Sequence, residues 1–366
     1  MTGTSGVGEA GVVPGLVRGL VGRVVPGGGD FVWSPGGVWL ALAAVGCGAR
    51  GRTAEELRGV LGVAGEEAAA VVTGVGRALA GADGVAGAVG VWSRVPVYEG
   101  FRDGLPGVGF GVLGARARGE LDAWVRAASG GRVTGLPLPL DGSEDLVLLG
   151  ALALKAAWRT AFPAGATRPA PFTDAHGAVR SVPTMHRRIP AASAWRVRHG
   201  VVVELPCAGE RPVRVRFVLG EPGAGPADVL PLAWEARRAP VPAEAVDLAL
   251  PRFSLRTRTD FLPWLEALGA GGALRPDADF SGLSPVPLCV SGVVQEAVLE
   301  VAEEGVEAAA VTQVAMTRSA ARPRPVTAER IAFDRPFGVV VLDAEGEWPL
   351  FAGWRAGTDD APQGAS

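Results

Sequence analysis

The chain holds three histidines, His176, His186 and His199, the residue type that most often acts as a general base or a metal ligand. The sequence contains neither the H-E-x-x-H motif of zinc proteases nor the G-x-S-x-G motif of serine hydrolases. We therefore interpret each histidine as a surface or strand residue. We predict that the protein is not an enzyme and has no catalytic residue, metal site or cofactor.

The stretch GFGVLG at residues 109–114 matches the dinucleotide-binding fingerprint G-x-G-x-x-G. With 54 glycines in 366 residues, about one such match is expected by chance. No convincing strand precedes the stretch, as a nucleotide-binding unit would require. We predict a flexible glycine-rich connection instead.

Arginines cluster at 187, 188, 196 and 198, where they could bind a polyanion. Arginines interleaved along strands more commonly form a solvated face, and that is our expectation here. The whole chain has 35 basic and 38 acidic side chains and a net charge of −3. No global field would attract nucleic acid or an anionic membrane, so we predict neither as a partner.

The segment EEGVEAAAVTQVAMTRSAARP, residues 303–323, is rich in small side chains. Alternate residues form an uncharged set that suits a strand face packed on a core. The members of this set are Val306, Ala308, Ala310, Thr312, Val314 and Met316. Alanine and glutamate also favour a helix, and the proline-rich end favours an exposed loop. Strand, helix and loop all remain open, which makes the segment a candidate conformational switch.

Local signals predict the elements around these residues. Ser34 and Pro35 are typical of a helix start, and Thr53 with Glu56 forms a capping box for a second helix that ends at Gly62. We predict a third helix over 121–136, stopped by two glycines, and a short fourth one over 259–269, capped near Thr259. Residues 144–158 are apolar throughout, so helix and strand remain open there.

Strands dominate the second half of the sequence. We predict them at 201–207, 212–219, 246–258 and, as a pair around a Glu-Gly turn, 337–354. Helices early, strands late and no βαβ rhythm indicate an α+β fold. No linker divides the chain, so we expect one domain over 1–366.

Composition bounds the class of protein. Hydrophobic residues make up 48% of the chain and the mean hydropathy is +0.26, enough for a large core. Cys47, Cys207 and Cys289 are too few and too scattered for a disulfide framework, so we expect buried reduced thiols. The N-terminal residues lack the features of a signal peptide. We therefore expect a cytoplasmic protein, with non-classical export left open.

Residues 290–312, VSGVVQEAVLEVAEEGVEAAAVT, resemble the conserved strand and hinge of the serpin family, and other stretches agree in the same order. These are FVWSPGGVWLALAAVGCGARGRTAEEL (31–57), LKAAW through FPAGATRPAPF (154–172), VPTMHR (182–187), VELPC (203–207), LALPRFSL (248–255), ADFSGLS (278–284), FDRPFGVVV (333–341) and PLFAGW (349–354). The resemblance covers about residues 15–356, with the hinge of a bacterial-type inhibitor. It implies three β-sheets, eight or nine α-helices and an exposed reactive loop at about 305–325, with flexible termini at 1–14 and 357–366.

The resemblance also implies a function, the suicide inhibition of serine proteases by a monomer with a metastable fold. A protease attacks the loop, and the cleaved loop then inserts into the main sheet through a hinge. The hinge residues would be Glu303, Glu304, Gly305, Val306, Glu307, Ala308, Ala309 and Ala310. A charged or bulky side chain on the inserting face would stall insertion, and the uncharged set lacks one.

The bait bond has two candidates. The usual spacing from Glu303 leads to Ser319–Ala320, which would suit an elastase-like or subtilisin-like enzyme. Arg318–Ser319 lies one residue earlier and would suit a trypsin-like protease with an acidic pocket. We favour Arg318.

Several positions depart from the family's pattern. The shutter beneath the point where the sheet opens usually holds Ser, Asn and His, and we match these to Gly37, Asp122 and Gln295. We expect Gln295 to hydrogen-bond with Asp122, and Trp158 to lie at the top of the sheet, where insertion begins. The altered shutter keeps an alternative open, a non-inhibitory serpin that acts as a carrier or chaperone-like binding protein.

Overall fold

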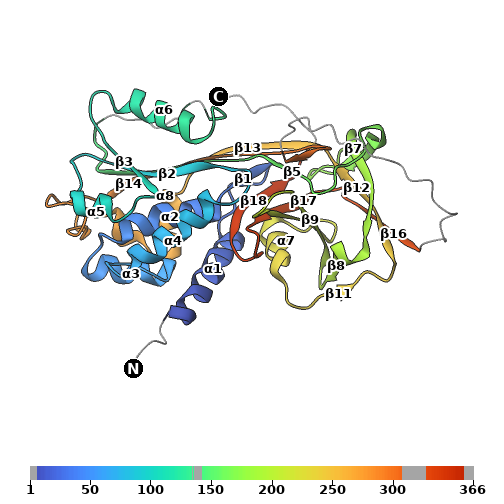
Figure 1. Ribbon diagram of the computed structural model, residues 1–366, viewed down its shortest axis with the longest axis horizontal. Helices are drawn as coiled ribbons and strands as arrows, with labels where there is room; N and C mark the ends of the chain where they lie inside the picture. Colours follow the sequence, from blue (N-terminus) through green and yellow to red (C-terminus); the bar gives the residue numbers. More distant parts are fainter. Residues whose placement is uncertain (1–5, 134, 136–141, 307–326, 358–366) are drawn as a thin grey trace.

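The computed structural model describes residues 6–133, 135, 142–306 and 327–357 (Figure 1). Over these ranges the chain forms eight α-helices and three β-sheets, which confirms the predicted α+β class. The helices are α1 (Gly6–Arg23), α2 (Pro35–Gly46), α3 (Gly51–Leu61), α4 (Ala68–Ala80), α5 (Glu99–Asp103), α6 (Ala117–Ala128), α7 (Pro226–Val229) and α8 (Leu262–Leu268). None of these helices has the length and apolar character needed to cross a membrane.

The sheet that positions the candidate site is called here the central sheet. Its strands, in spatial order, are β3 (Val108–Val112), β2 (Val85–Ser93), β4 (Leu146–Leu154), β14 (Val290–Val301), β15 (Gly305–Val306) and β5 (Ala156–Ala157). A further strand, β13 (Phe253–Asp260), pairs with β14 over the length of β13.

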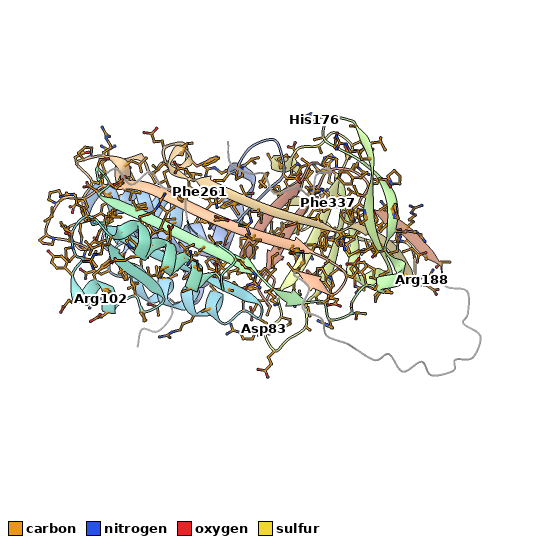
Figure 2. All side chains as sticks on the ribbon, turned by 90° about the horizontal axis from the view of Figure 1, so that it is seen from above. Asp83, Arg102, His176, Arg188, Phe261 and Phe337 are labelled. Atoms are coloured by element: carbon orange, nitrogen blue, oxygen red, sulfur yellow. The ribbon has the colours of Figure 1, made fainter. Side chains whose placement is uncertain are left out.

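The other two sheets lie toward the end of the molecule opposite α5, and β1 and β18 extend to its middle (Figure 1). The four-stranded sheet has the order β16 (Ala328–Ala332), β12 (Ala245–Pro251), β7 (Val179–Pro190) and β6 (Arg168–Thr173). The C-terminal sheet has the order β1 (Phe31–Trp33), β18 (Pro349–Arg355), β17 (Phe337–Leu342), β10 (Arg214–Gly220), β9 (Gly200–Pro206), β8 (Ala194–Val197) and β11 (Ala239–Pro240). Figure 2 shows Arg188 of the four-stranded sheet at one end of the molecule and Arg102 of α5 at the other.

Helices cover both faces of the central sheet. Helix α6 lies on the outer face, while α2, α3 and α4 lie beneath the inner face (Figure 1). Inward residues of β4, such as Leu148 and Leu152, join the main core, and outward residues, such as Leu149, pack with Leu121 and Val125 of α6. A strand buried on both faces must be apolar at every position. This answers the question that periodicity left open, because 144–158 is mainly strand β4.

The glycine-rich stretch at 109–114 is not the flexible connection that we predicted, because its first residues belong to strand β3, parallel to β2. The glycines make room for two indole rings on the outer face of the sheet. A Cβ at Gly111 would lie 2.1 Å from Nε1 of Trp92, and one at Gly109 would lie 2.7 Å from Nε1 of Trp124. The two rings pack edge to face, 4.9 Å apart. Packing therefore explains these glycines without a nucleotide.

The predicted helix ends are partly right. The Oγ of Ser34 caps α2, and Gly62 ends α3 with a left-handed φ of +80°. The capping box was wrong, because α3 begins at Gly51 and Thr53 lies inside it, where its Oγ accepts from the backbone N–H of Asp279. A distant chain segment thus took the hydroxyl that the local pattern assigned to a cap.

The other two predicted helices are shifted. Helix α6 begins at Ala117, four residues before the predicted start, and ends at Ala128, before the two glycines. Helix α8 begins at Leu262, because Thr259 still belongs to strand β13. Its predicted stop at Gly269 is confirmed, with φ +96°.

Candidate functional site

The chain reverses direction at the end of β14. The backbone N–H of Ala302 donates to the carbonyl of Gly305 at 2.9 Å, and the N–H of Gly305 donates back to Ala302 at 3.3 Å. Glu303 and Glu304 therefore form the tip of a tight hairpin. Strand β15, which contains the next two predicted hinge residues, Gly305 and Val306, runs back antiparallel to β14.

Strand β15 lies between two strands that have separated. Val306 is opposite Val301 of β14 on one side and Ala156 of β5 on the other, and it is fully buried. Gly305 approaches β5 so closely that a Cβ would lie 2.2 Å from the carbonyl oxygen of Ala156. Only glycine fits here without displacing the backbone. The upper end of the central sheet thus already admits the first two residues of a new strand.

Trp158, the predicted residue at the top of the sheet, holds the hairpin in place. Its backbone N–H donates to the carbonyl of Glu304 and its indole Nε1 donates to the carbonyl of Ala302, both at 2.9 Å. The N–H of Phe162 donates to the carbonyl of Glu303 at 2.8 Å. Three hydrogen bonds from one short segment therefore fix the conformation in which the hinge leaves β14.

The Glu303 side chain attaches the hairpin to the neighbouring four-stranded sheet. Its carboxylate accepts from the Oγ1 of Thr167 at 2.7 Å, and an Arg252 guanidinium nitrogen lies 4.0 Å away. The Glu303 side chain is 16% exposed and that of Arg252 is 52% exposed. The hydroxyl is the closer and better shielded of the two partners.

Below the hairpin, the central sheet is closed. Strands β4 and β14 pair directly in a parallel ladder from Val290 opposite Leu146 to Val298 opposite Ala153. Parallel ladders are slightly less stable per residue than antiparallel ones. The structure therefore shows one sheet with an open upper end and a closed middle.

Gln295 lies beneath the closed part, at the predicted shutter. Its Oε1 accepts from the backbone N–H of Ser34 at 2.6 Å, and its Nε2 donates to the carbonyl of Ser34 at 3.1 Å. Gln295 is 2% exposed and Ser34 is fully buried. A Cβ on Gly37 would lie 3.0 Å from Nε2 of Gln295, and one on Gly150, which is opposite Gln295 in the ladder, would lie 3.2 Å away. Two glycines thus leave space for the amide.

The predicted hydrogen bond between Gln295 and Asp122 was wrong. Asp122 belongs to α6 on the outer face of the sheet, and its Oδ2 lies 4.0 Å from the Nε of Arg118. Gly37, which was predicted for the shutter, does lie beside Gln295, and so do Ser34 and Gly150, which were not predicted as shutter residues. The continuous apolar run around Gly150 could have indicated this position, because a lone glycine in a buried strand marks a close approach.

Seven of the predicted residues lie outside the described part of the chain. They are Glu307, Ala308, Ala309 and Ala310 of the hinge, and Arg318, Ser319 and Ala320 at the bait bond. Their roles stay predictions.

The histidines and cysteines do not converge. Nδ1 of His199 lies 3.2 Å from a carboxylate oxygen of Glu221, while His176 is exposed at a turn and His186 lies on strand β7. Within the described ranges, no three His, Cys, Asp or Glu residues are placed to hold a metal ion. Burial raises the pKa of the Cys47 and Cys207 thiols to about 12, so both are protonated at neutral pH, as expected of buried thiols. Cys289 is half-buried, also with a free thiol.

Comparisons with known proteins agree with this architecture. The family model described as Serpin (serine protease inhibitor) matches residues 107–355, more than half of the chain. Serpin A9 of Mus musculus is 31% identical over 250 residues, which cover 65% of this chain but 57% of that protein. A putative serpin-Z6C of Oryza sativa subsp. japonica is 29% identical over 381 residues, covering 89% of this chain and 90% of that one.

Solved serpin structures also match the fold of this chain. The crystal structure of the thermophilic serpin Tengpin in its native state matches with a TM-score of 0.82 and 20% identity, covering 98% of this chain and 96% of that one. Three sheets, the arrangement of helices and the sequence matches lead to one conclusion: the chain belongs to the serpin family.

Proposed function

We propose that this serpin is a suicide-substrate inhibitor of serine proteases, which traps the acyl-enzyme by inserting its cleaved loop between β4 and β14. The family is one of serine protease inhibitors rather than catalysts. The observation that carries the proposal is strand β15, because Val306 already pairs antiparallel with strands on both sides and Gly305 pairs with β5.

The registers that β15 has with its two neighbouring strands agree with each other. If β15 were extended in its present register with β14, Ala309 would lie opposite Val298, and the register with β5 would place Ala309 opposite Ala153. Val298 and Ala153 are themselves paired in the present ladder. A single new strand could therefore enter between them without any slip in register.

The incoming side chains suit the space that the sheet offers. In that register Ala308 would face Leu299 and Leu154, and Thr312 would face Gln295 and Gly150. Small inward residues between large leucines fit a core that tolerates little overpacking. Each ladder hydrogen bond is worth about 0.5–1.5 kcal/mol net. A strand of about a dozen residues would therefore gain on the order of 10 kcal/mol from its ladder.

The chemistry belongs to the attacking protease. Its serine oxygen adds to the carbonyl carbon of the bait residue, the peptide bond to the next residue breaks, and an ester joins the two proteins. The amine of the next residue leaves with a proton, which frees the loop at that end. Insertion would then move the ester-linked protease away from the position where water completes the reaction.

The shutter favours a second candidate, a non-inhibitory serpin that acts as a carrier or chaperone-like binding protein. Gln295 joins β14 to the start of α2 through both groups of the Ser34 backbone, and Gly37 and Gly150 offer no other side chain for it to bond. If this contact broke slowly, the protease would hydrolyse the acyl-enzyme before the loop inserted, and the serpin would be cleaved without trapping it.

Incubation with trypsin and with a subtilisin-like protease separates the two candidates. The inhibitor should give a covalent adduct on denaturing gels. Mass spectrometry should show that the released C-terminal fragment begins at Ser319 or Ala320. Clean cleavage by every protease tried, with no adduct, would contradict the proposal and favour the carrier.

A further inference from the structure

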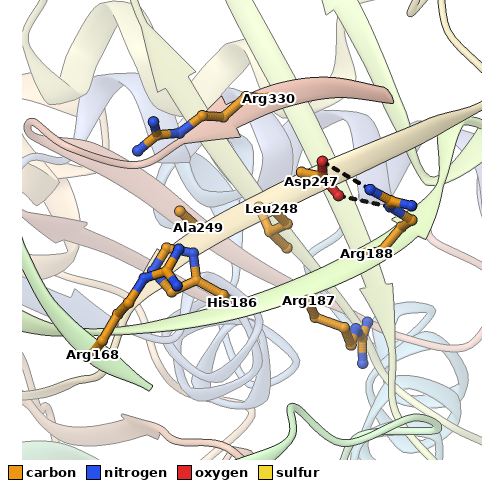
Figure 3. Close-up of a pocket in the computed structure, with 8 residues that line it drawn as sticks. All are labelled: Arg168, His186, Arg187, Arg188, Asp247, Leu248, Ala249 and Arg330. Atoms are coloured by element: carbon orange, nitrogen blue, oxygen red, sulfur yellow. Dashed lines mark hydrogen bonds and ion pairs between the residues drawn. The ribbon is translucent and has the colours of Figure 1, made fainter. Parts of the chain in front are cut away.

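The outer face of the four-stranded sheet carries a cavity of about 380 Å³ with a strongly basic lining (Figure 3). Arg168 of β6, His186 of β7 and Arg330 of β16 come from three different strands. The remaining strand, β12, contributes the small Ala249, which is opposite His186. Alternation along the strands thus brings basic groups together beside this small residue, and Asp247 and Leu248 of β12 complete the lining.

The acidic side chain that lines the cavity, Asp247, already forms an ion pair. Asp247 binds Arg188 through two hydrogen bonds, from Nε to Oδ1 at 2.7 Å and from a terminal nitrogen to Oδ2 at 3.1 Å. In the described part of the chain, neither Arg168 nor Arg330 makes an ion pair. Two full positive charges therefore face the cavity without a counter-ion.

The imidazole of His186 is affected by these two positive charges. Its Nε2 is buried and has no hydrogen-bond partner. Its pKa is lowered, first by burial and then by the charges of Arg168 and Arg330. The other adjacent charges, Arg188 and Asp247, neutralise each other, and the Arg187 guanidinium lies 4.7 Å from the ring of Phe162, turned away from the cavity in Figure 3. An anion that bridged the two free arginines would relieve their repulsion and favour the protonated imidazole.

The cavity lies between the two ends of the predicted reactive loop. Strand β16 begins at Ala328, two residues after the end of the segment 307–326, and Arg168 follows Thr167, which hydrogen-bonds to Glu303 at the other end. A protease bound to this segment would be held by a stretch of chain whose two described ends adjoin this sheet. The sequence of this segment includes three arginines and one glutamate, so the segment would also favour binding of an acidic protease.

We propose that this cavity is an anion-binding exosite that receives a surface carboxylate of the attacking protease. The inference rests on the function proposed above. Two uncompensated guanidinium groups would attract an acidic protease from a distance and speed its association, and salt would weaken the effect. The site would thus select among proteases that accept the same bait residue.

The first experiment tests the anion site without a protease. Only three histidines contribute imidazole signals to the proton NMR spectrum of the whole chain, so each pKa can be followed. Inorganic phosphate should raise the pKa of His186 by about one unit relative to sodium chloride of equal ionic strength. His176 should not respond, and the R168Q/R330Q variant should lose the shift. An unchanged His186 would overturn the site.

The second experiment tests the occupant. At low ionic strength, the rate constant of adduct formation should be about tenfold higher with an anionic trypsin than with a cationic trypsin of the same specificity. The R168E/R330E variant should lose this preference. The R77E/R102E variant, with the same charge change at exposed residues of α4 and α5, should keep it, because these helices lie toward the other end of the molecule from the four-stranded sheet. If trypsin forms no adduct, the same comparison is made between an acidic and a basic protease that do form one.

The outcomes separate the two proposals. If phosphate shifts His186 but R168E/R330E keeps the preference, the cavity binds a small phosphate or sulfate group and the protease exosite is overturned. If no protease forms an adduct, the inhibitor function and the exosite that depends on it both fail, while the NMR titration still decides whether the anion site exists.

Discussion

The upper end and the middle of the central sheet are built from the same strands but are held differently. At the upper end, β15 separates β14 from β5, and Trp158 supports it through backbone and indole hydrogen bonds. In the middle, β4 and β14 pair directly. There α6 covers the outer face and the Gln295 amide binds Ser34 beneath the inner face.

This difference indicates where each kind of constraint acts. The upper end is prepared for a new strand, since its antiparallel partners are already in place. The middle resists one, because the parallel ladder, the helix and the Gln295 contact must all yield. The sheet thus holds the first residues of an added strand at its upper end and is closed below them, which is the arrangement that the proposed insertion needs.

A disulfide across the closed middle should have the largest effect. Ala153 and Val298 are directly opposite in the ladder, within the separation that a disulfide spans. In the A153C/V298C variant, oxidation should abolish the adduct and reduction should restore it, because the strands can part only when the bond is broken. Denaturing gels with the A153C variant as the oxidation control measure this. Equal adduct from both redox forms would exclude entry between these strands.

A charge at the entrance should come next. Val306 is already buried between β14 and β5, so V306R should displace β15 from the sheet of the intact protein. Returning an unpaired guanidinium to this position when the strand inserts would cost several kcal/mol. The variant should become a substrate, with many molecules cleaved per protease trapped. V306T keeps the branched shape and should trap nearly as well. The stoichiometry of inhibition distinguishes them, and trapping by V306R would refute the importance of β15.

Loss of the Gln295 amide should have a moderate effect, confined to the closed state. Q295L would leave the buried N–H of Ser34 unpaired, at about 1–3 kcal/mol, while the Ser34 carbonyl would still accept from the N–H of Val38. The uncleaved protein should unfold at lower urea concentration with an unchanged m-value. Unaltered unfolding would show that the amide does not hold the middle closed.

The smallest effect should come from R252A. The Arg252 guanidinium lies 4.0 Å from the Glu303 carboxylate and its side chain is half-exposed, so the pair is worth less than about 1 kcal/mol. T167V removes the 2.7 Å hydrogen bond to the same carboxylate and should cost more. Urea unfolding of the two variants ranks the contacts, and the reverse order would assign the larger role to the arginine.

Local signals in the sequence predicted much of the fold and little of the shutter. The helix start at Ser34 and the helix ends at Gly62 and Gly269 follow from their own residues. The partner of Gln295 could not be predicted in this way, because Ser34 is 261 positions away and offers only backbone groups. Asp122 was misassigned for the same reason, since only the packed structure shows that α6 lies on the other face of the sheet.

The central claim, that the cleaved loop becomes a strand between β4 and β14, is tested most directly by thermal unfolding. The protein is cut by a protease within 307–326, purified from it and compared with the intact chain. An extra gain on the order of 10 kcal/mol should raise the Tm by on the order of 10 °C. A cleaved protein that melts at the same temperature as the intact one, or lower, would contradict the account.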